Sequence, residues 1–439
     1  MAMRYVHLLG PLDWVHFPER DLQIQWTHAP VPYAPFVAAC LVKLDQHLPY
    51  LSSLRQFLID NPALLWALGF PIILIADTPW GFDADRCLPT PRHFTRLLRQ
   101  LPNDALQFLL DNSVHLLQAE LAAKGHTLGE CISLDTKHIL AWVKENNPKA
   151  YISNRFDKEH QPAGDPDCRL GCKRRRNQRP TAEPPPTPRA NPVPADTLAV
   201  GEFYWGYASG VVAAKIPDCG EFVLAEVTQP FDQPDVSYFF PLMILTEQRL
   251  GFRPPRGAFD AAFDAFYVYE HFHSAGGFAA VPFVERGAHP QHRQFADNGA
   301  PLCPAGLAMP LKYRFIDKTA FLPHECGRYV CPLVYPQRSE QTCPIQHARW
   351  AKGGCVTTLP LSIGARLRYT LDRHSDDYLS TYKQRTATER INSQAVELGI
   401  ERPKLRNGQA ITNFNTLTYV LINVRALQRL RQSTAKARA

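Results

Sequence analysis

The segment TYKQRTATERINSQ, residues 381–394, carries a tyrosine, an arginine and a glutamate at spacings of three and four residues. The segment is predicted to be helical. In a helix, Tyr382, Arg385 and Glu389 face the same way because positions i, i+3 and i+7 lie along one stripe. A guanidinium one turn before a carboxylate can orient that carboxylate or contact a phosphate. The stripe therefore indicates that the Glu389 carboxylate has a role on the surface that this helix faces.

Further acids lie beside predicted strands. Asp135 interrupts the apolar run CISLDTKHILAWV, which is predicted to be a strand. An acid within such a strand costs free energy unless it is paired, lies at an exposed end or binds a metal ion. Asp260 follows another predicted strand, and Asp264 lies four residues later, where an acid can cap the next helix. Asp135, with Asp260 or Asp264, therefore joins Glu389 as a candidate for chemistry.

The first 125 residues are predicted to form a helical module. Thr90 and Pro91 suit the N-cap and the first position of one helix. The next helix has its apolar residues on one face and ends at Gly125. These apolar residues are Leu106, Leu109, Leu110, Val114, Leu117 and Leu121. Arginines lie on the outer face of the module, where they are either solvated or in contact with DNA. They are Arg92, Arg96 and Arg99.

The middle of the chain is predicted to form strands and helices in alternation. Residues 203–216 and 221–230 are predicted strands around the turn PDCG, and a helix is predicted over 235–251. The strand that ends near Asp260 precedes a helix whose aromatic stripe suits core packing, and a further strand, AAVPFV, follows. These elements place the acids on or beside one sheet.

Two segments differ in composition from the rest. Residues 173–197 are basic and then proline-rich, with little to bury, so a disordered loop or linker is predicted. Residues 301–361 are rich in cysteine. Thiolates can bind zinc tetrahedrally, although these spacings are wider and less regular than in common zinc motifs. The candidate zinc ligands are Cys326, Cys331, Cys343 and Cys355. The nearby His324 or His347 fits a zinc-stabilised insertion. The alternative is a set of reduced cysteines in a loop-rich insertion.

Bulk composition bounds the class of protein. A chain of 439 residues suggests two or three units, and 45% apolar with 20% charged residues is ordinary for a globular protein. The net charge of +7 suits a polyanionic partner. Eleven scattered cysteines and a start without a secretory signal favour a reducing cytosol. The most apolar run, residues 62–76, is too short to span a bilayer and is predicted to be buried core.

Three acidic segments resemble a known family. The segment ISLDT around Asp135, the segment FDAAFD followed by GGFAAVP, and the segment YKQRTATER are similar to the three acidic motifs of bacterial insertion-sequence transposases of the DDE class. One subgroup has the third motif Tyr-x2-Arg-x3-Glu-x6-Lys, and here Val396 stands at the lysine position. The segments LPTPRHFTRLLRQL, GDPDCRLGCKRRRN and YWGYASGVVAA also resemble that family, so the similarity covers most of the chain.

The resemblance implies an α/β fold. It implies a ribonuclease H-like mixed sheet flanked by helices, with the core formed by residues 126–300 and 362–439. Residues 1–125 are expected to be an N-terminal helical domain that binds DNA ends. Residues 301–361 are expected to be a cysteine-rich insertion in the core. The last residues are expected to be a basic tail after the helix that carries Glu389.

The resemblance also implies chemistry and partners. Asp135, Asp260 and Glu389 are the expected catalytic residues and ligands of Mg²⁺ or Mn²⁺, with two ions supporting in-line phosphoryl transfer. The residues expected to support catalysis or contact DNA are Tyr382, Arg385, Arg390 and Asn392. The expected partners are double-stranded DNA at the terminal inverted repeats and the target site, and a second copy of the chain. The expected location is the cytoplasm, on the nucleoid, with no membrane association.

Two alternative functions stay open. One is a decayed or domesticated transposase that acts as a nuclease or DNA-binding protein without transposition. The other is a DNA-binding protein that never had catalytic activity. Three carboxylates argue against the second alternative, because they repel phosphate unless metal ions cover them.

Overall fold

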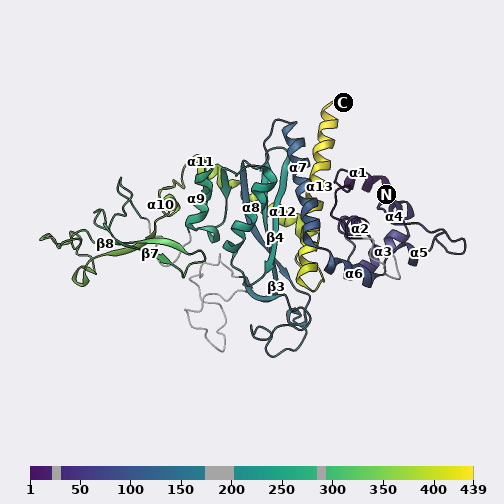
Figure 1. The fold of residues 1–439 in the computed structure, drawn as a ribbon, viewed down its shortest axis with the longest axis horizontal. Helices are drawn as coiled ribbons and strands as arrows, with labels where there is room; N and C mark the ends of the chain where they lie inside the picture. Colours follow the sequence, from purple (N-terminus) through teal and green to yellow (C-terminus); the bar gives the residue numbers. More distant parts are fainter. Residues whose placement is uncertain (22–30, 174–201, 284–292, 439) are drawn as a thin grey trace, which may run out of the picture.

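A six-stranded mixed sheet lies at the centre of the part of the chain that the computed structural model describes, residues 1–21, 31–173, 202–283 and 293–438 (Figure 1). The strands are β1 Cys131–Leu140, β2 Arg169–Lys173, β3 Glu202–Ile216, β4 Gly220–Pro230, β5 Arg256–Ala258 and β6 Phe278–Ala280. Strand β1 lies between β3, to which it is antiparallel, and β5, to which it is parallel. Strands β4 and β2 pair antiparallel with β3, and β6 pairs parallel with β5. The sheet therefore confirms the α/β class.

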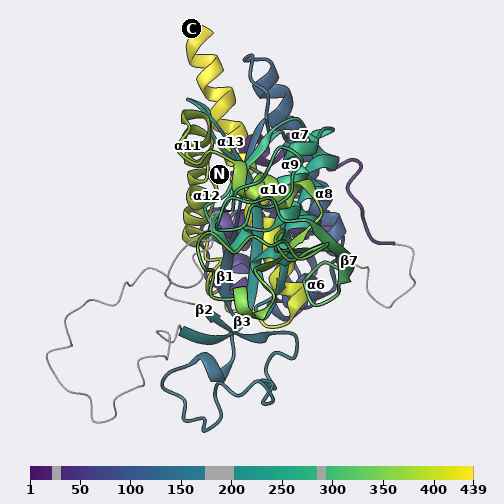
Figure 2. The same cartoon turned by 90° about the vertical axis from the view of Figure 1, so that its left-hand side faces the viewer.

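Helices cover both faces of this sheet. Helices α8 Phe239–Leu250 and α9 Phe266–Ser274 share one hydrophobic core with the sheet. Helices α12 Thr386–Glu397 and α13 Gly408–Arg438 cover the opposite face. Figure 2 shows α11 and α12 along one side of the sheet and α8 toward the other. The alternation of side chains along β1 thus directs Asp135 and its row toward the α12 face, since its cross-strand partner Val211 packs in that core.

The N-terminal helices form the predicted module. They are α1 Ala2–Leu9, α2 Tyr33–Asp45, α3 Leu51–Ile59, α4 Pro62–Ala67, α5 Ala84–Cys87, α6 Pro91–Gln100 and α7 Asn103–Ala122. The Thr90 side chain caps α6 by accepting the His93 N–H, and Pro91 is its first residue. All six apolar residues predicted for one face of α7 are buried. Gly125, after the end of α7, has a left-handed φ of 79°, which glycine adopts without strain.

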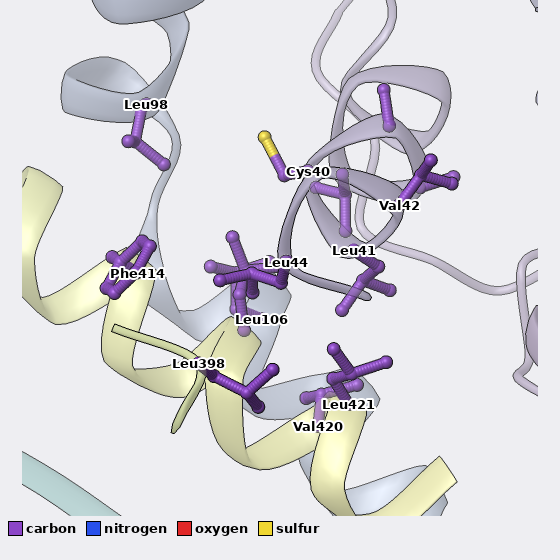
Figure 3. Close-up of a cluster of buried hydrophobic side chains, with 14 of the residues drawn as sticks. Cys40, Leu41, Val42, Leu44, Leu98, Leu106, Leu398, Phe414, Val420 and Leu421 are labelled. Carbon is purple, nitrogen blue, oxygen red and sulfur yellow. The ribbon is translucent and has the colours of Figure 1, made fainter. Parts of the chain in front are cut away.

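The C-terminal residues form a long helix where a basic tail was expected. Helix α13 packs against β4 on one side and against α2, α6 and α7 on the other. Figure 3 shows side chains of α2, α6 and α7 meeting Phe414, Val420 and Leu421 of α13. The N-terminal module and this face of the sheet therefore share one core, and residue 125 marks a change of secondary structure within it.

The apolar run 62–76 is less buried than predicted. Leu64, Leu65 and Phe70 are buried, but Trp66 and Leu74 are 71% and 79% exposed. Helix α4 is one short element at the edge of the module, so only one side of the run faces the core. None of the helices in the described residues is both long enough and apolar enough to cross a bilayer.

The insertion forms a separate small sheet. Its strands, β7 Leu311–Asp317, β8 His324–Val330 and β9 Val356–Pro360, pair antiparallel in that order. Helices α10 Ile363–Thr370 and α11 Asp376–Lys383 lead from it back to the central sheet. In Figure 1 the insertion lies at the opposite end of the molecule from the N-terminal helices. The proline-rich loop predicted after Lys173 lies outside the described residues.

An ionic cluster joins the module to α13. The buried Asp45 carboxylate at the end of α2 accepts hydrogen bonds from Arg425 at 2.6 and 2.9 Å, and from the Tyr5 hydroxyl at 2.8 Å. Arg4 also donates to it, at 2.5 Å. A buried carboxylate is stable only when its charge is compensated in this way. This cluster fixes α2 against α13.

We expect Arg425→Met to lower the free energy of unfolding by about 1–3 kcal/mol, because Asp45 stays buried with one cation fewer. Arg431→Met, on the same helix, is the control: its partner Glu120 is only partly buried, so its loss costs less than about 1 kcal/mol. Thermal unfolding of both variants measures the difference. Equal melting temperatures would show that Asp45 does not depend on Arg425.

Candidate active site

Two of the predicted acids lie at the same level of adjacent parallel strands. Ser133 on β1 pairs with Ala258 on β5, and Asp135 and Asp260 each follow two residues later. Positions two residues further along stay on the same side of the sheet, and neighbouring strands are about 4.8 Å apart. The register therefore brings Asp135 and Asp260 next to each other where β5 ends.

The electrostatics of Asp135 reflect this placement. Burial raises the pKa of the Asp135 carboxyl to about 6, and the nearby charges of Asp260 and Asp235 add to the rise. The Thr136 N–H, which donates to Asp135 Oδ1 at 2.9 Å, and the Arg385 guanidinium act in the opposite direction. The site thus holds several acids of like charge near one partly buried carboxyl.

Asp260 is held by the backbone that follows it. Its Oδ1 accepts the Ala262 N–H at 2.8 Å and so caps a one-turn 3-10 helix, Ala261–Phe263. The structure therefore assigns a capping role to Asp260, where the sequence suggested one for Asp264.

Asp264 is bound within the protein. Its side chain is fully buried, and Arg368 contacts both of its oxygens, with Nε at 2.6 Å from Oδ1. The Tyr269 hydroxyl also donates to Oδ1, at 2.9 Å. Helix α9 begins at Phe266 without a side-chain cap. Asp264 thus has its charge neutralised by a structural ion pair, which makes Asp260 the better candidate for chemistry.

The stripe of Tyr382, Arg385 and Glu389 spans two helices, not one. Helix α11 ends at Lys383 and α12 begins at Thr386. The stripe survives because the Arg385 backbone is still helical, with φ −55° and ψ −27°. The guanidinium carbon of Arg385 lies 5.8 Å from the centre of the Tyr382 ring, and its Nη2 donates to Glu389 Oε1 at 2.6 Å.

Helix α12 connects this stripe to the acids of the sheet. The Asn392 side-chain amide donates to Asp135 Oδ2 at 3.1 Å. Glu389 is one turn earlier on the same helix, and side chains three residues apart have their Cβ atoms about 5–6 Å from each other. Glu389 is 47% exposed and paired with Arg385. The structure therefore brings Glu389 to the same region as Asp135. The carboxylate oxygens of Asp135, Asp260 and Glu389, all in described residues, do not all lie within 4.8 Å of one another.

Two neighbouring residues make contacts that the sequence did not reveal. Asp235, at the start of a 3-10 helix after β4, accepts the Thr136 hydroxyl at 2.8 Å and acts on the charge of Asp135. Only its proximity in space gives it a role, since in the sequence it resembles an ordinary helix-capping acid. Arg390, which was expected to support catalysis or contact DNA, pairs with Glu221 at 2.5 Å, and its side chain is 61% exposed.

The predicted zinc ligands divide into two places. Cys331, Cys343 and Cys355 line one small cavity of the insertion. Cys326 lies on β8, beside Asp317 and His324. The ligand atoms of these last three residues lie within 4.8 Å of one another, so within the described residues this group could hold a metal ion.

The chain matches no protein-family model and no curated protein. What the acids can do is therefore inferred from their positions and chemistry.

Replacing the two rival acids should separate their roles. Asp264→Asn should lower the free energy of unfolding by about 3–5 kcal/mol, because it leaves the Arg368 charge without its buried partner. Asp260→Asn should change stability by less than about 1 kcal/mol, because asparagine is also a good cap. Thermal unfolding of both variants tests this. A larger loss from Asp260→Asn would mean that the two assignments are reversed.

The raised pKa of Asp135 predicts a dependence of stability on pH. The folded state binds the proton more tightly than the unfolded chain, so the stabilisation is complete below about pH 4 and is lost as pH rises to about 6. In EDTA, Asp135→Asn should therefore raise the melting temperature at pH 8 and have a smaller effect at pH 5. Glu397→Gln, on an exposed residue of α12, is the control. An Asp135→Asn variant less stable than the parent at pH 8 would contradict this.

Proposed function

We propose that the protein is a DNA transposase of the DDE class, which cleaves the ends of its own insertion sequence and joins them to target DNA. The observation that carries the proposal is the register that sets Asp135 beside Asp260 under α12, the helix of Glu389. These are the acids of the three motifs that resemble the family. Residues far apart in the chain thus come from three elements to one region.

The central sheet supports a ribonuclease H-like core. Strand β1 carries the first acid and lies in the interior of the sheet, between the antiparallel strands β3 and β4 and the parallel strands β5 and β6. A core of that kind requires the first two acids to meet near the sheet centre, which this register allows. The insertion enters after β6 and returns through α10 and α11, so the helix of Glu389 follows it.

The site residues suit a hard divalent cation. Asp135 and Asp260 offer carboxylate oxygens, the ligands that Mg²⁺ and Mn²⁺ prefer. Burial, and to a smaller extent the charge of Asp260, raises the pKa of Asp135, and a bound cation would offset both effects. Asp135, Asp260 and Glu389 would hold the ions. When bound, such ions neutralise phosphate charge and activate the attacking oxygen.

The chain's own groups orient these carboxylates. Asn392 and the Thr136 N–H each bind one oxygen of Asp135, which fixes the plane of the carboxylate. The Ala262 N–H fixes Asp260 in the same way. Such fixed geometry is what in-line phosphoryl transfer demands of a protein, because positioning accounts for most of the catalysis.

Arg385 links DNA binding to the third acid. In the structure it neutralises Glu389 and lies close enough to Asp135 to lower its pKa. A guanidinium also binds phosphate well. In the proposed mechanism, a DNA phosphate takes Arg385 away from Glu389 and frees that carboxylate to turn toward Asp135.

The N-terminal module is proposed to bind the DNA ends. The arginines of α6 predicted to face outward are exposed; they are Arg92, Arg96 and Arg99. Because the module shares its core with α13 and the sheet, DNA on α6 would be held at a fixed position relative to the acids. A dimer that pairs two ends, acting on the nucleoid in the cytoplasm, completes the proposal.

The proposal is tested by strand cleavage of DNA that carries the gene's own flanking ends, with Mg²⁺ or Mn²⁺. We expect the parent to cut at the ends, and Asp135→Asn, Asp260→Asn and Glu389→Gln to bind that DNA but cut it at least about 100-fold more slowly. Glu397→Gln should cut normally, because its side chain is exposed on α12 away from these contacts.

Two results would change the assignment. A parent that binds the ends without cutting under either metal ion would indicate a decayed copy or a DNA-binding protein. An active Asp260→Asn variant would move the second ligand from Asp260 to Asp264.

A further inference from the structure

Four cysteines from distant points of the insertion surround one small cavity. Its lining includes Cys303, Cys331, Cys343 and Cys355, together with His347. The cavity volume is about 10 Å³, which is at the lower limit for one water molecule. A space of this size among thiols suits a single ion and excludes an organic ligand.

The four cysteines at the cavity are far apart in the sequence. They span up to 52 positions, from 303 to 355, so only the fold of the insertion brings them to one place.

The backbone around these cysteines is arranged to present their thiols. Gly353 and Gly354, which immediately precede Cys355, have left-handed φ angles of 94° and 83°. A Cβ on Gly354 would lie 2.5 Å from the Cys331 Cβ, so only glycine fits there. The His347 N–H points at Cys343 Sγ at 3.5 Å, a contact that stabilises a thiolate.

The insertion has too little hydrophobic core to explain its fold. Its buried apolar cluster contains Cys303, Met309, Tyr329 and Leu359, with other side chains only partly buried around them. A unit of about 60 residues generally needs a metal ion or disulfides when its core is this small. The structure has all of its cysteines free, including the four at the cavity.

We propose that Cys303, Cys331, Cys343 and Cys355 bind a structural zinc ion that holds the insertion together. Four thiolates at about 2.3 Å from zinc make a closed tetrahedral site, typical of structural zinc. No three of these sulfur atoms, all in the described residues, lie within 4.8 Å of one another. Binding therefore draws them together, through side-chain rotations in the turns that carry them.

Two nearby groups define the limits of this site. His347 lines the cavity, but its Nδ1 accepts the Arg349 N–H at 3.1 Å. We therefore do not count it among the zinc ligands. Cys326 is buried in the same insertion but does not line the cavity. It makes a matched control, because its substitution also removes a buried thiol of the insertion.

The test is the zinc content of the full-length protein, purified from zinc-supplemented cells without chelators and measured by mass spectrometry of the metal. We expect about one zinc ion per chain. Cys303→Ser, Cys331→Ser, Cys343→Ser and Cys355→Ser should each lower zinc retention after dialysis by at least about 10-fold. Cys326→Ser and His347→Ala should retain the full content. Loss of zinc from Cys326→Ser but not from Cys331→Ser would place the metal at Asp317, His324 and Cys326 and overturn the proposal.

A second measurement on the unaltered protein excludes misfolding of the variants as the cause. Burial alone shields several cysteines outside the insertion, so this readout uses the five cysteines within it. In the zinc-loaded protein under mild denaturant, peptide mass mapping should find the four at the cavity protected from alkylation and Cys326 modified. Cobalt substitution should give the absorption of a tetrahedral four-thiolate site. A parent without zinc, a different protected set or a Cys331–Cys355 disulfide would each overturn the proposal. None of these readouts depends on DNA cleavage, so they stand or fall separately from the transposase proposal.

Discussion

The juxtaposition of two carboxylates by one parallel strand pair is the constraint on which the site depends. Asp135 and Asp260 face the same way because β1 and β5 pair from Cys131 to Ser133, and both acids follow in the same register. Burial of the Asp135 carboxyl raises its pKa, and the like charge of Asp260 adds to the rise. Backbone N–H groups and Asn392 hold the carboxylates in place despite that cost. An arrangement with this unfavourable free energy suits a function that needs concentrated negative charge.

A second buried acid ties the same row of the sheet to α13. Asp135 pairs across β1 and β3 with Val211, which in turn pairs with Glu226 on β4. Burial raises the pKa of Glu226, and hydroxyls of Thr228 and Thr416 donate to it at 2.6 and 2.8 Å. Both Glu226 oxygens have hydrogen-bond donors, and a network of this kind fixes the position of a helix more specifically than apolar packing does. Together with the Asp45 cluster at the other side of α13, it makes the sheet and the N-terminal module one body.

The insertion is stabilised differently from the central body. The central body is stabilised by two large hydrophobic cores, whereas the insertion has a small one. A cross-link among cysteines would compensate for that small core without changing the acids. The two proposed sites thus have opposite ligand chemistry: carboxylate oxygens, which suit a hard cation, at the sheet, and thiols, which suit zinc, in the insertion.

The sequence by itself determined the local features. These include the capped helix at Thr90, the buried face of α7, the β3–β4 pair and the strand that carries Asp135, because propensity, capping and periodicity act over a few residues. Tertiary structure alone decided that Asp264 pairs with Arg368 and that Cys303 replaces Cys326 at the cavity. It also decided the exposure of Trp66 and the place of α13. The physical reason is that strand register and long-range packing set which side chains meet, and spacing along the chain carries no information about partners more than a hundred residues away.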